Sequence, residues 1–138
     1  MEQLGLHASR KLAGRTVRPQ DAVMFDIDDT LWRPANGMTI GPMLDLLYTA
    51  RMLGYTIVII TARPGEEENQ RWTVSQLHQM GVVPDHLVFA PPGMKDTVKS
   101  ATKLNYIMSV GDQWTDLGLS EFWVKLAAPN DGRQGASF

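Results

Sequence analysis

Ala22-Val-Met-Phe-Asp-Ile-Asp-Asp-Thr30 begins as a short apolar run and ends in three acidic residues and a threonine. The run predicts a buried strand, because its apolar residues follow one another without polar interruption. Asp26 and Asp28 are separated by one residue, so an extended backbone directs both carboxyl groups to the same side. Carboxylates crowded at the end of a buried strand repel each other, and a nearby cation would relieve that repulsion.

Strand and helix patterns alternate along the chain after this stretch. Apolar residues recur at helical spacing within residues 40–53, and Gly54 follows as a stop signal. Residues 55–60 are rich in β-branched side chains, which predicts a second buried strand. Further helices are predicted at 66–80, 95–104 and 115–120, and further strands at 87–89, 106–110 and 122–126. This alternation predicts an α/β fold of three layers, in which helices cover both faces of a parallel sheet.

Length and composition are those of one ordinary globular domain. The chain has 138 residues, of which 43% are hydrophobic and 20% charged, and its formal net charge is −2. This charge gives no global basic field for a nucleic-acid partner. The absence of cysteine excludes disulfides, thiolate metal sites and a cysteine nucleophile, and it fits a reducing compartment.

The chain ends carry weaker signals. No apolar run approaches the ~18 residues that span a bilayer, and the first residues lack the apolar region of a signal peptide. We therefore expect no membrane partner and a cytoplasmic location. We expect residues 1–20 to form an N-terminal arm or short helix, residues 21–128 the α/β domain, and residues 129–138 a loose tail.

Polar residues follow the predicted strands at the point where each strand ends. Thr61-Ala-Arg-Pro64 follows the second strand, and Gly111-Asp-Gln-Trp-Thr-Asp116 follows the fourth. Three lysines lie between the third and fourth strands, at positions 95, 99 and 103. Ligands bind to such sheets beyond the carboxyl ends of the strands, so we expect these side chains to converge on one rim.

The residue types at this rim favour phosphate chemistry. Several carboxylates without a neighbouring histidine or cysteine suit Mg²⁺ better than Zn²⁺. A carboxylate beside Mg²⁺ can attack phosphorus, while the metal and a lysine neutralise the phosphoryl oxygens and a hydroxyl such as that of Thr61 holds one of them. A second acid can protonate the leaving alcohol and then activate water.

Each of these residues has a structural explanation when taken alone. An aspartate after a strand is commonly a turn former or helix cap. Arg63 could pair with the acidic run Glu66-Glu-Glu68 at a helix start. The four tryptophans and three histidines read as packing or surface residues, with no metal-ligand spacing among the histidines. The chemical interpretation depends on acids, hydroxyl and lysine recurring in order at successive strand ends.

Three segments resemble motifs of the haloacid dehalogenase superfamily. Phe25-Asp-Ile-Asp-Asp-Thr-Leu31 is similar to its DxDx[T/V] motif, Ile57-Val-Ile-Ile-Thr61 to its second motif, and Gly111-Asp-Gln-Trp-Thr-Asp116 to its GDxxxD motif. The resemblance spans about residues 21–128. Thr-Ala-Arg-Pro and Gly-Asp-Gln-Trp also resemble the subfamily of acid phosphatases and polynucleotide 3′-phosphatase domains.

The resemblance implies a Rossmann-like parallel sheet with strand order 5-4-1-2-3. It implies Asp26 as the nucleophile, Asp28 as the general acid/base and Thr61 as a ligand of the phosphoryl group. Asp112 would bind Mg²⁺ together with Asp26 and the backbone carbonyl of Asp28. Asp116 would support the metal site.

The lysine of the third motif is less clearly marked. Lys99, within Asp-Thr-Val-Lys, resembles the lysine context of the polynucleotide phosphatase domains and is the preferred candidate. Lys95 is the second candidate. Lys103 lies one helical turn beyond Lys99 and is less favoured. Arg63 is expected to support the site.

The spacing leaves no room for a cap domain. Only 30 residues separate Thr30 from Thr61, and a helix occupies part of them. Residues 32–38 would then form a short flap over an open site. Such a site admits a nucleic-acid end or a phosphoprotein, and it admits a small phosphorylated molecule if a homo-oligomer closes the entrance.

The predicted function is Mg²⁺-dependent hydrolysis of a phosphomonoester through an aspartyl-phosphate on Asp26. A phosphotransferase and a polynucleotide-end phosphatase are alternatives on the same fold. A receiver-like phosphoacceptor is a different class, but the third strand ends in Phe-Ala-Pro-Pro92 and offers no acceptor aspartate. A silent Mg²⁺-binding relative and a dehalogenase complete the alternatives, and the second acid at Asp28 favours phosphate over dehalogenation.

Overall fold

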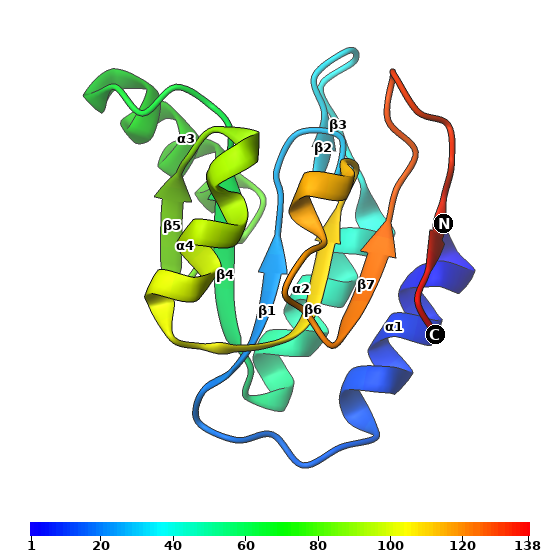
Figure 1. The fold of residues 1–138 in the computed structure, drawn as a ribbon. Helices are drawn as coiled ribbons and strands as arrows, with labels where there is room; N and C mark the ends of the chain where they lie inside the picture. The colour runs from blue at the N-terminus through cyan, green and yellow to red at the C-terminus, as the bar shows by residue number, and fades with distance from the viewer.

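A computed structural model describes residues 1–138 and contains a six-stranded sheet. The strands lie in the order β5-β4-β1-β6-β7-β8, and all neighbours are parallel except β7 and β8 (Figure 1). Their bounds are β1 Asp21–Phe25, β4 Thr56–Thr61, β5 His86–Phe89, β6 Asn105–Gly111, β7 Phe122–Lys125 and β8 Gly135–Ala136. When the five parallel strands β1, β4, β5, β6 and β7 are numbered 1 to 5 in chain order, the sheet has the predicted order 5-4-1-2-3. That prediction is confirmed, and β1 is the central strand of the five.

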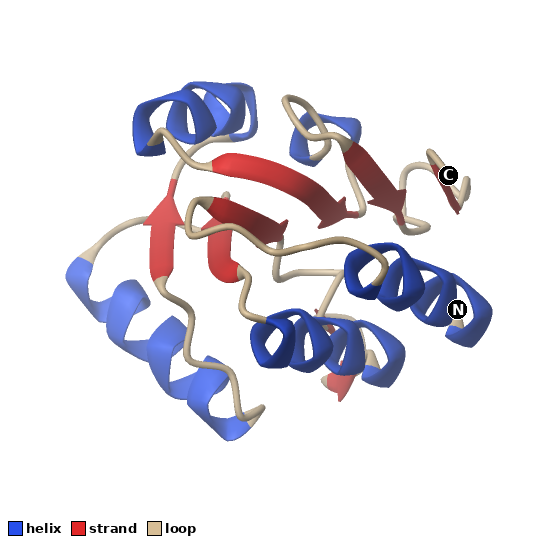
Figure 2. Cartoon of the chain, turned by 90° about the horizontal axis from the view of Figure 1, so that it is seen from below, coloured by secondary structure: helices blue, strands red, loops and turns tan.

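Helices cover both faces of the sheet. On one face lie α1 Glu2–Ala13, α2 Gly41–Leu53 and α3 Glu67–Gln79, and on the other lies α4 Lys95–Thr102. Figure 2, seen along the sheet from below, separates the two helical layers. Two 3-10 turns, η1 Pro92–Met94 and η2 Trp114–Asp116, lie at the carboxyl edge of the strands. The three-layer α/β class predicted from the sequence is therefore confirmed. None of the helices is both long enough and apolar enough to cross a bilayer.

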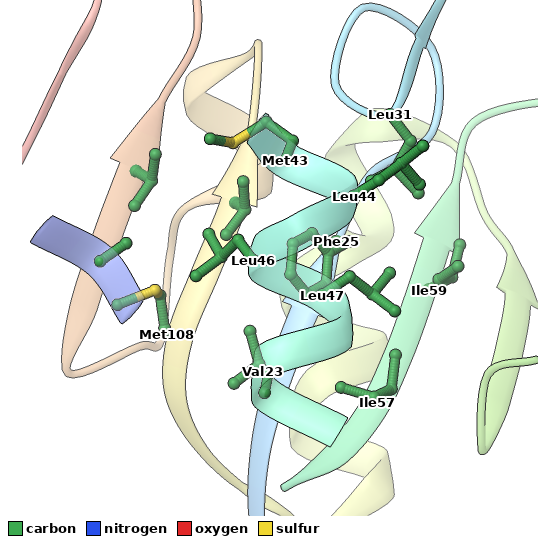
Figure 3. Close-up of a cluster of buried hydrophobic side chains, with 14 of the residues drawn as sticks. Val23, Phe25, Leu31, Met43, Leu44, Leu46, Leu47, Ile57, Ile59 and Met108 are labelled. Carbon is green, nitrogen blue, oxygen red and sulfur yellow. The ribbon is translucent and has the colours of Figure 1, made fainter. Parts of the chain in front are cut away.

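The central strand is buried on both faces because its side chains divide between two cores. Val23 and Phe25 belong to the larger core under α1 and α2, whereas Ala22 and Met24 belong to the smaller core under α4. This division follows from the alternation of side chains along an extended backbone. Figure 3 shows the larger core, in which four α2 side chains pack among residues of β1, β4 and β6: Met43, Leu44, Leu46 and Leu47.

Both ends of the chain join the fold. We expected an arm or short helix before residue 21; α1 packs on α2 and buries Ala8 and Leu12 in the larger core. We expected residues 129–138 to be loose; instead β8 pairs with β7, and the Phe138 ring packs edge-on against Phe122 at 5.9 Å. The tail contains few apolar residues, but its backbone N–H and C=O groups find hydrogen-bond partners at the edge of β7. Sequence composition around a two-residue strand carries too little signal to reveal that pairing.

A small hairpin forms the expected flap. Strands β2 Trp32–Arg33 and β3 Met38–Thr39 pair antiparallel, and Gly37 occupies the turn with a φ of 70°. Figure 1 shows the hairpin projecting beyond the carboxyl ends of β1 and β6. No cap domain intervenes between β1 and β4, so the carboxyl edge of the sheet carries only short segments.

Candidate active site

Two aspartates meet at the carboxyl ends of adjacent central strands. Asp26 follows β1 directly, and its backbone N–H donates to the carbonyl of Val110 in β6 at 3.0 Å. Asp112 likewise follows β6 directly. Together with Asp116 they offer carboxylate oxygens that all lie within 4.8 Å of one another, and all three residues are buried. The expected convergence of these three acids on one rim is therefore found.

Asp116 reaches this group through the η2 turn. Its Oδ2 accepts from the backbone N–H of Gln113 at 3.1 Å, which closes the turn as a capping box. The turn folds back so closely that a side chain at Gly111 would overlap the Asp116 carboxyl group. Glycine at 111 is thus a steric requirement of the site. Gln113, which the sequence analysis did not single out, also donates from Nε2 to Asp112 Oδ2 at 3.3 Å.

Lys95 supplies the positive charge of the cluster. It is the first residue of α4, and its Nζ lies 3.2 Å from Asp26 Oδ1 and 2.5 Å from Asp116 Oδ1. Burial alone would lower the pKa of Lys95, but the carboxylates of Asp26 and Asp116 outweigh burial and raise it. The side chain is therefore a fixed ammonium group beside the expected nucleophile.

Lys99, the lysine preferred from the sequence, is buried but lies one turn further along α4. Its Nζ donates to Ser109 Oγ at 3.0 Å, to the Asp116 carbonyl at 2.7 Å and to the Gly118 carbonyl at 2.6 Å. Burial lowers its pKa to about 8. The geometry thus favours Lys95 over Lys99 as the lysine beside Asp26. Helical spacing in the sequence does not separate the two lysines, because residues four apart lie on the same face of a helix.

Thr61 ends β4 and is buried next to β1. Its Oγ1 accepts from the backbone N–H of Arg63 at 3.2 Å, which leaves the hydroxyl hydrogen free for another acceptor. Thr30, in the turn after β1, is fully buried and its Oγ1 has no partner within the chain. The rim therefore holds hydroxyl groups as well as carboxylates and ammonium.

Asp28 lies outside the acidic cluster and is held by a different set of groups. Its carboxylate accepts from Arg63 Nε at 3.0 Å, from Arg63 Nη2 at 2.8 Å and from Trp32 Nε1 at 2.8 Å. Burial by itself would raise the pKa of Asp28, but these hydrogen bonds outweigh it and hold the pKa below its usual value. Arg63 thus pairs with Asp28, whereas the sequence alternative was a pair with Glu66–Glu68.

The acidic cluster has the composition of a site for a hard divalent cation. Lys95 is the one ammonium group that contacts these carboxylates, and it reaches two of the three, those of Asp26 and Asp116. Burial and the charge of Asp116 raise the pKa of Asp26 well above its ordinary value, and burial also raises that of Asp112. Lys95 donates to Oδ1 of Asp26 and Gln113 donates to Oδ2 of Asp112, and the carboxyl groups of Asp26 and Asp112 are also close enough to hydrogen-bond each other. Both oxygens of Asp116 accept hydrogen bonds, so Asp116 fits a supporting role.

The fold is a three-layer α/β fold of Rossmann type, with a buried acidic cluster at the carboxyl rim of its sheet. Among solved structures, the chain is similar to the class C acid phosphatase from Bacillus anthracis, solved with tungstate bound. The TM-score is 0.61 at 13% sequence identity, and the match covers 86% of this chain and 65% of that chain. At this identity the likeness concerns the fold. No protein-family model and no curated protein sequence matches the chain.

Proposed function

We propose that the protein is a phosphomonoester hydrolase that transfers the phosphoryl group of its substrate to Asp26. The observation that carries this proposal is the contact between Lys95 Nζ and Asp26 Oδ1 at 3.2 Å, within a cluster of three buried carboxylates. A buried carboxylate held beside an ammonium group has a fixed direction and a neighbour that can stabilise phosphoryl oxygens. The fold it shares with an acid phosphatase supports the same conclusion.

Carboxylate oxygens of Asp26 and Asp112, with the backbone carbonyl of Asp28, would hold Mg²⁺. When bound, the metal would offset the charge of the carboxylates and of the phosphoryl oxygens. Lys95 would offset further charge on the phosphoryl group, and the Thr61 hydroxyl would donate to one of its oxygens. Asp116 would keep Lys95 in place through the 2.5 Å contact.

The reaction would proceed in two displacements. A carboxylate oxygen of Asp26 attacks phosphorus, and the bond between phosphorus and the leaving oxygen breaks as Asp28 gives that oxygen a proton. Water then attacks the phosphorus of the aspartyl-phosphate and gives a proton to Asp28, while the bond between phosphorus and the Asp26 oxygen breaks. This releases inorganic phosphate and restores both aspartates. Asp28 is suited to both steps, because it lies two residues after Asp26 and outside the cluster that surrounds Lys95.

Arg63 would orient Asp28 for this exchange. Two guanidinium donors and the Trp32 indole fix the carboxylate in one direction while it is ionised. To take up a proton, Asp28 must give up at least one of these hydrogen bonds. The bond from the indole N–H of Trp32, a residue of the flap, is one of them. Transfer of the phosphoryl group to an alcohol instead of water, a receiver-like phosphoacceptor and a silent Mg²⁺-binding protein remain alternatives without a specific observation in their favour.

The test is release of inorganic phosphate from a panel of phosphomonoesters with Mg²⁺. The panel contains p-nitrophenyl phosphate, glycerol phosphate, a sugar phosphate, mononucleotides and phosphorylated oligonucleotides. We expect release by the wild-type protein, none with EDTA, and none by Asp26→Asn, whose thermal melting confirms that it is folded. Rapid acid quenching of Asp28→Asn should trap phosphate on the protein or show formation slowed ~10²–10⁴-fold.

The activity of Asp28→Asn on substrates with different leaving groups tests whether Asp28 donates the proton. Leaving groups that depart readily as anions, such as p-nitrophenolate, need a proton less than alkoxides do, so the variant should lose more activity on glycerol phosphate. Activity that survives Asp26→Asn would contradict the nucleophile. Phosphate retained stably on wild-type Asp26 would instead support the receiver-like class.

A further inference from the structure

The side-chain amide group of Gln113 has a hydrogen-bond partner on every side. Its Nε2 donates to Asp112 Oδ2 at 3.3 Å and to Asn130 Oδ1 at 2.9 Å. Its oxygen accepts from the backbone N–H of Asp116, which completes the capping box of η2. Both hydrogens of the amide nitrogen and the amide oxygen are therefore engaged within the chain. The amide group links an acid of the cluster to a residue of the loop that follows β7.

The partners of this amide group allow only one orientation. An ionised carboxylate only accepts hydrogen bonds, so the amide nitrogen must face Asp112. A backbone N–H only donates, so the amide oxygen must face Asp116. If the amide group were turned over, its oxygen would face the carboxylate and its nitrogen would face the N–H. The nitrogen then has one hydrogen left, and Asn130 accepts it through its side-chain oxygen.

Asn130 is itself held by a tight turn in the loop between β7 and β8. The backbone N–H of Ala128 donates to the carbonyl of Asp131 at 2.7 Å, and the reverse hydrogen bond measures 3.1 Å. Pro129 and Asn130 form the corner of this turn, and the proline ring restricts the backbone there. Figure 1 shows the loop rising beyond the carboxyl end of β7. The turn therefore presents Asn130 to η2 in a defined position.

The loop has further attachments that do not involve the acidic cluster. Trp114 Nε1 donates to Asp131 Oδ2 at 3.3 Å, so η2 contacts two consecutive residues of the loop. The buried Lys125 donates from Nζ to the carbonyls of Leu126 at 2.7 Å and Arg133 at 3.2 Å, which closes the base of the loop. The indole N–H of Trp114 thus fastens the same loop to the same turn, but it donates to no acid of the cluster.

We infer that Gln113 is a positioning residue for a divalent cation at Asp112, and that Asn130 fixes the direction of its amide group. This inference rests on the proposed function, which assigns Mg²⁺ to Asp112. A hydrogen bond to one oxygen of a ligating carboxylate restricts the rotation of that carboxylate and directs its other oxygen to the metal. A carboxylate without such a bond loses rotational freedom when the cation binds, which weakens binding. Gln113 and Asn130 therefore raise the affinity for the cation without contacting it.

The test measures cation binding in the absence of substrate. Mn²⁺ is the probe, because it takes the same oxygen ligands as Mg²⁺ and its free ion is counted by electron paramagnetic resonance. We expect the Kd for Mn²⁺ to rise about 10-fold in Gln113→Ala and about 3- to 10-fold in Asn130→Ala. Asp112→Asn should abolish the binding, which assigns the counted ion to the acidic cluster. Binding that survives Asp112→Asn unchanged would overturn the inference.

A double-variant cycle tests whether Asn130 acts through Gln113. If it does, adding Asn130→Ala to Gln113→Ala should leave the Kd where the single substitution of Gln113 put it. Fully additive losses would overturn the role assigned to Asn130. Trp114→Phe is the matched control, because it removes the other hydrogen bond between η2 and the loop. Its Kd should equal that of the wild type, and a loss as large as that of Asn130→Ala would mean that loosening the loop alone weakens binding.

Failure of this inference is distinct from failure of the proposed function, because no phosphate ester takes part in the binding measurement. Weaker Mn²⁺ binding in Gln113→Ala and Asn130→Ala supports the inference even if no substrate is hydrolysed. An unchanged Kd in both variants overturns it and leaves the hydrolase in place. If the wild-type protein binds no Mn²⁺, the inference is overturned, and release of phosphate still decides the proposed function.

Discussion

Lys99 Nζ donates to the backbone carbonyl of Asp116 at 2.7 Å and thereby ties α4 to the turn that carries an acid of the cluster. The Gly118 carbonyl and Ser109 Oγ complete the three acceptors of the ammonium group. Lys95, one turn earlier, contacts the carboxylate of the same Asp116. Two lysines of α4 thus contact Asp116: Lys95 contacts its carboxylate, and Lys99 contacts its backbone carbonyl.

Lys99→Met should destabilise the fold more than it impairs chemistry. The substitution keeps an unbranched apolar stem but leaves three acceptors without their donor, and the two buried ones, Ser109 Oγ and the Asp116 carbonyl, each cost ~1–3 kcal/mol. We expect the free energy of unfolding to fall by ~2 kcal/mol or more, with an activity loss that follows from the loosened Asp116 turn. Denaturant unfolding and phosphate release on the same preparation check this. A stable but inactive variant would restore Lys99 as the catalytic lysine.

Lys95→Met should impair chemistry directly. Removing the ammonium group takes away the charge next to Asp26 where phosphoryl oxygens would gather, so we expect kcat to fall ~10²–10³-fold. In the metal-free protein, Asp26 and Asp116 would then face each other without compensation. Steady-state kinetics with p-nitrophenyl phosphate measure the effect, with Lys103→Met, at the exposed C-cap of α4, as the matched control. Equal rates for Lys95→Met and wild type would remove Lys95 from the proposed site.

The stability of the metal-free protein should fall as pH rises above the range in which free aspartate titrates. Burial and the charge of Asp116 raise the pKa of Asp26 in the folded chain well above 3.8, its value in the unfolded chain. The folded state therefore binds the proton more tightly, so the stabilisation is complete below pH 3.8 and is lost as pH rises through the raised pKa. Asp26→Asn removes this dependence, because asparagine stays neutral.

Thermal melting in EDTA at stepped pH checks this expectation. At pH 7 to 8 Asp26→Asn should melt above the wild type, and the difference should shrink toward pH 4. Adding Mg²⁺ should raise the wild-type melting temperature more than that of the variant, because ligand bound to the folded state stabilises it by mass action. A wild-type melting temperature that does not change when Mg²⁺ is added would argue against a cation at the acidic cluster.

Gly111→Ala should disrupt the site through a single methyl group. The added Cβ would overlap the Asp116 carboxyl group, which cannot move without breaking its contacts with Lys95 and Gln113. We expect a large loss of phosphate release together with lower stability. Gly41→Ala is the matched control, because nothing lies within 4 Å of its added Cβ. Comparable activity of the two variants would show that phosphate release does not require the Asp116 carboxyl group to occupy this position.

The sequence predicted the parallel sheet and the convergence of Asp26, Asp112 and Asp116 on one rim, whereas the strand order was implied by the family resemblance. These features follow from local signals: a buried strand needs consecutive apolar residues, and polar residues at its end must lie where the strands stop. The flap at residues 32–38 followed from the spacing between two motifs. Each of these features depends on residues close together in the chain and on a repeating connection between strands.

Other features depend on contacts between distant residues. Arg63 could have paired with the acidic run that follows it, but the structure gives it Asp28, 35 residues earlier. The pairing of β8 with β7 and the packing of α1 on α2 were not visible in the composition of either terminus. Local propensity is weak in such segments, so the partner surface decides their conformation.

The sequence by itself determined that an acidic rim would form at the ends of β1 and β6, because strand burial and side-chain alternation are properties of neighbouring residues. Only the tertiary structure decided that Lys95 contacts Asp26 while Lys99 supports the Asp116 backbone. Both lysines lie on one face of α4, four residues apart, and helical periodicity treats them alike. What separates them is the height at which α4 docks on the sheet, and that height is set by packing between segments far apart in the chain.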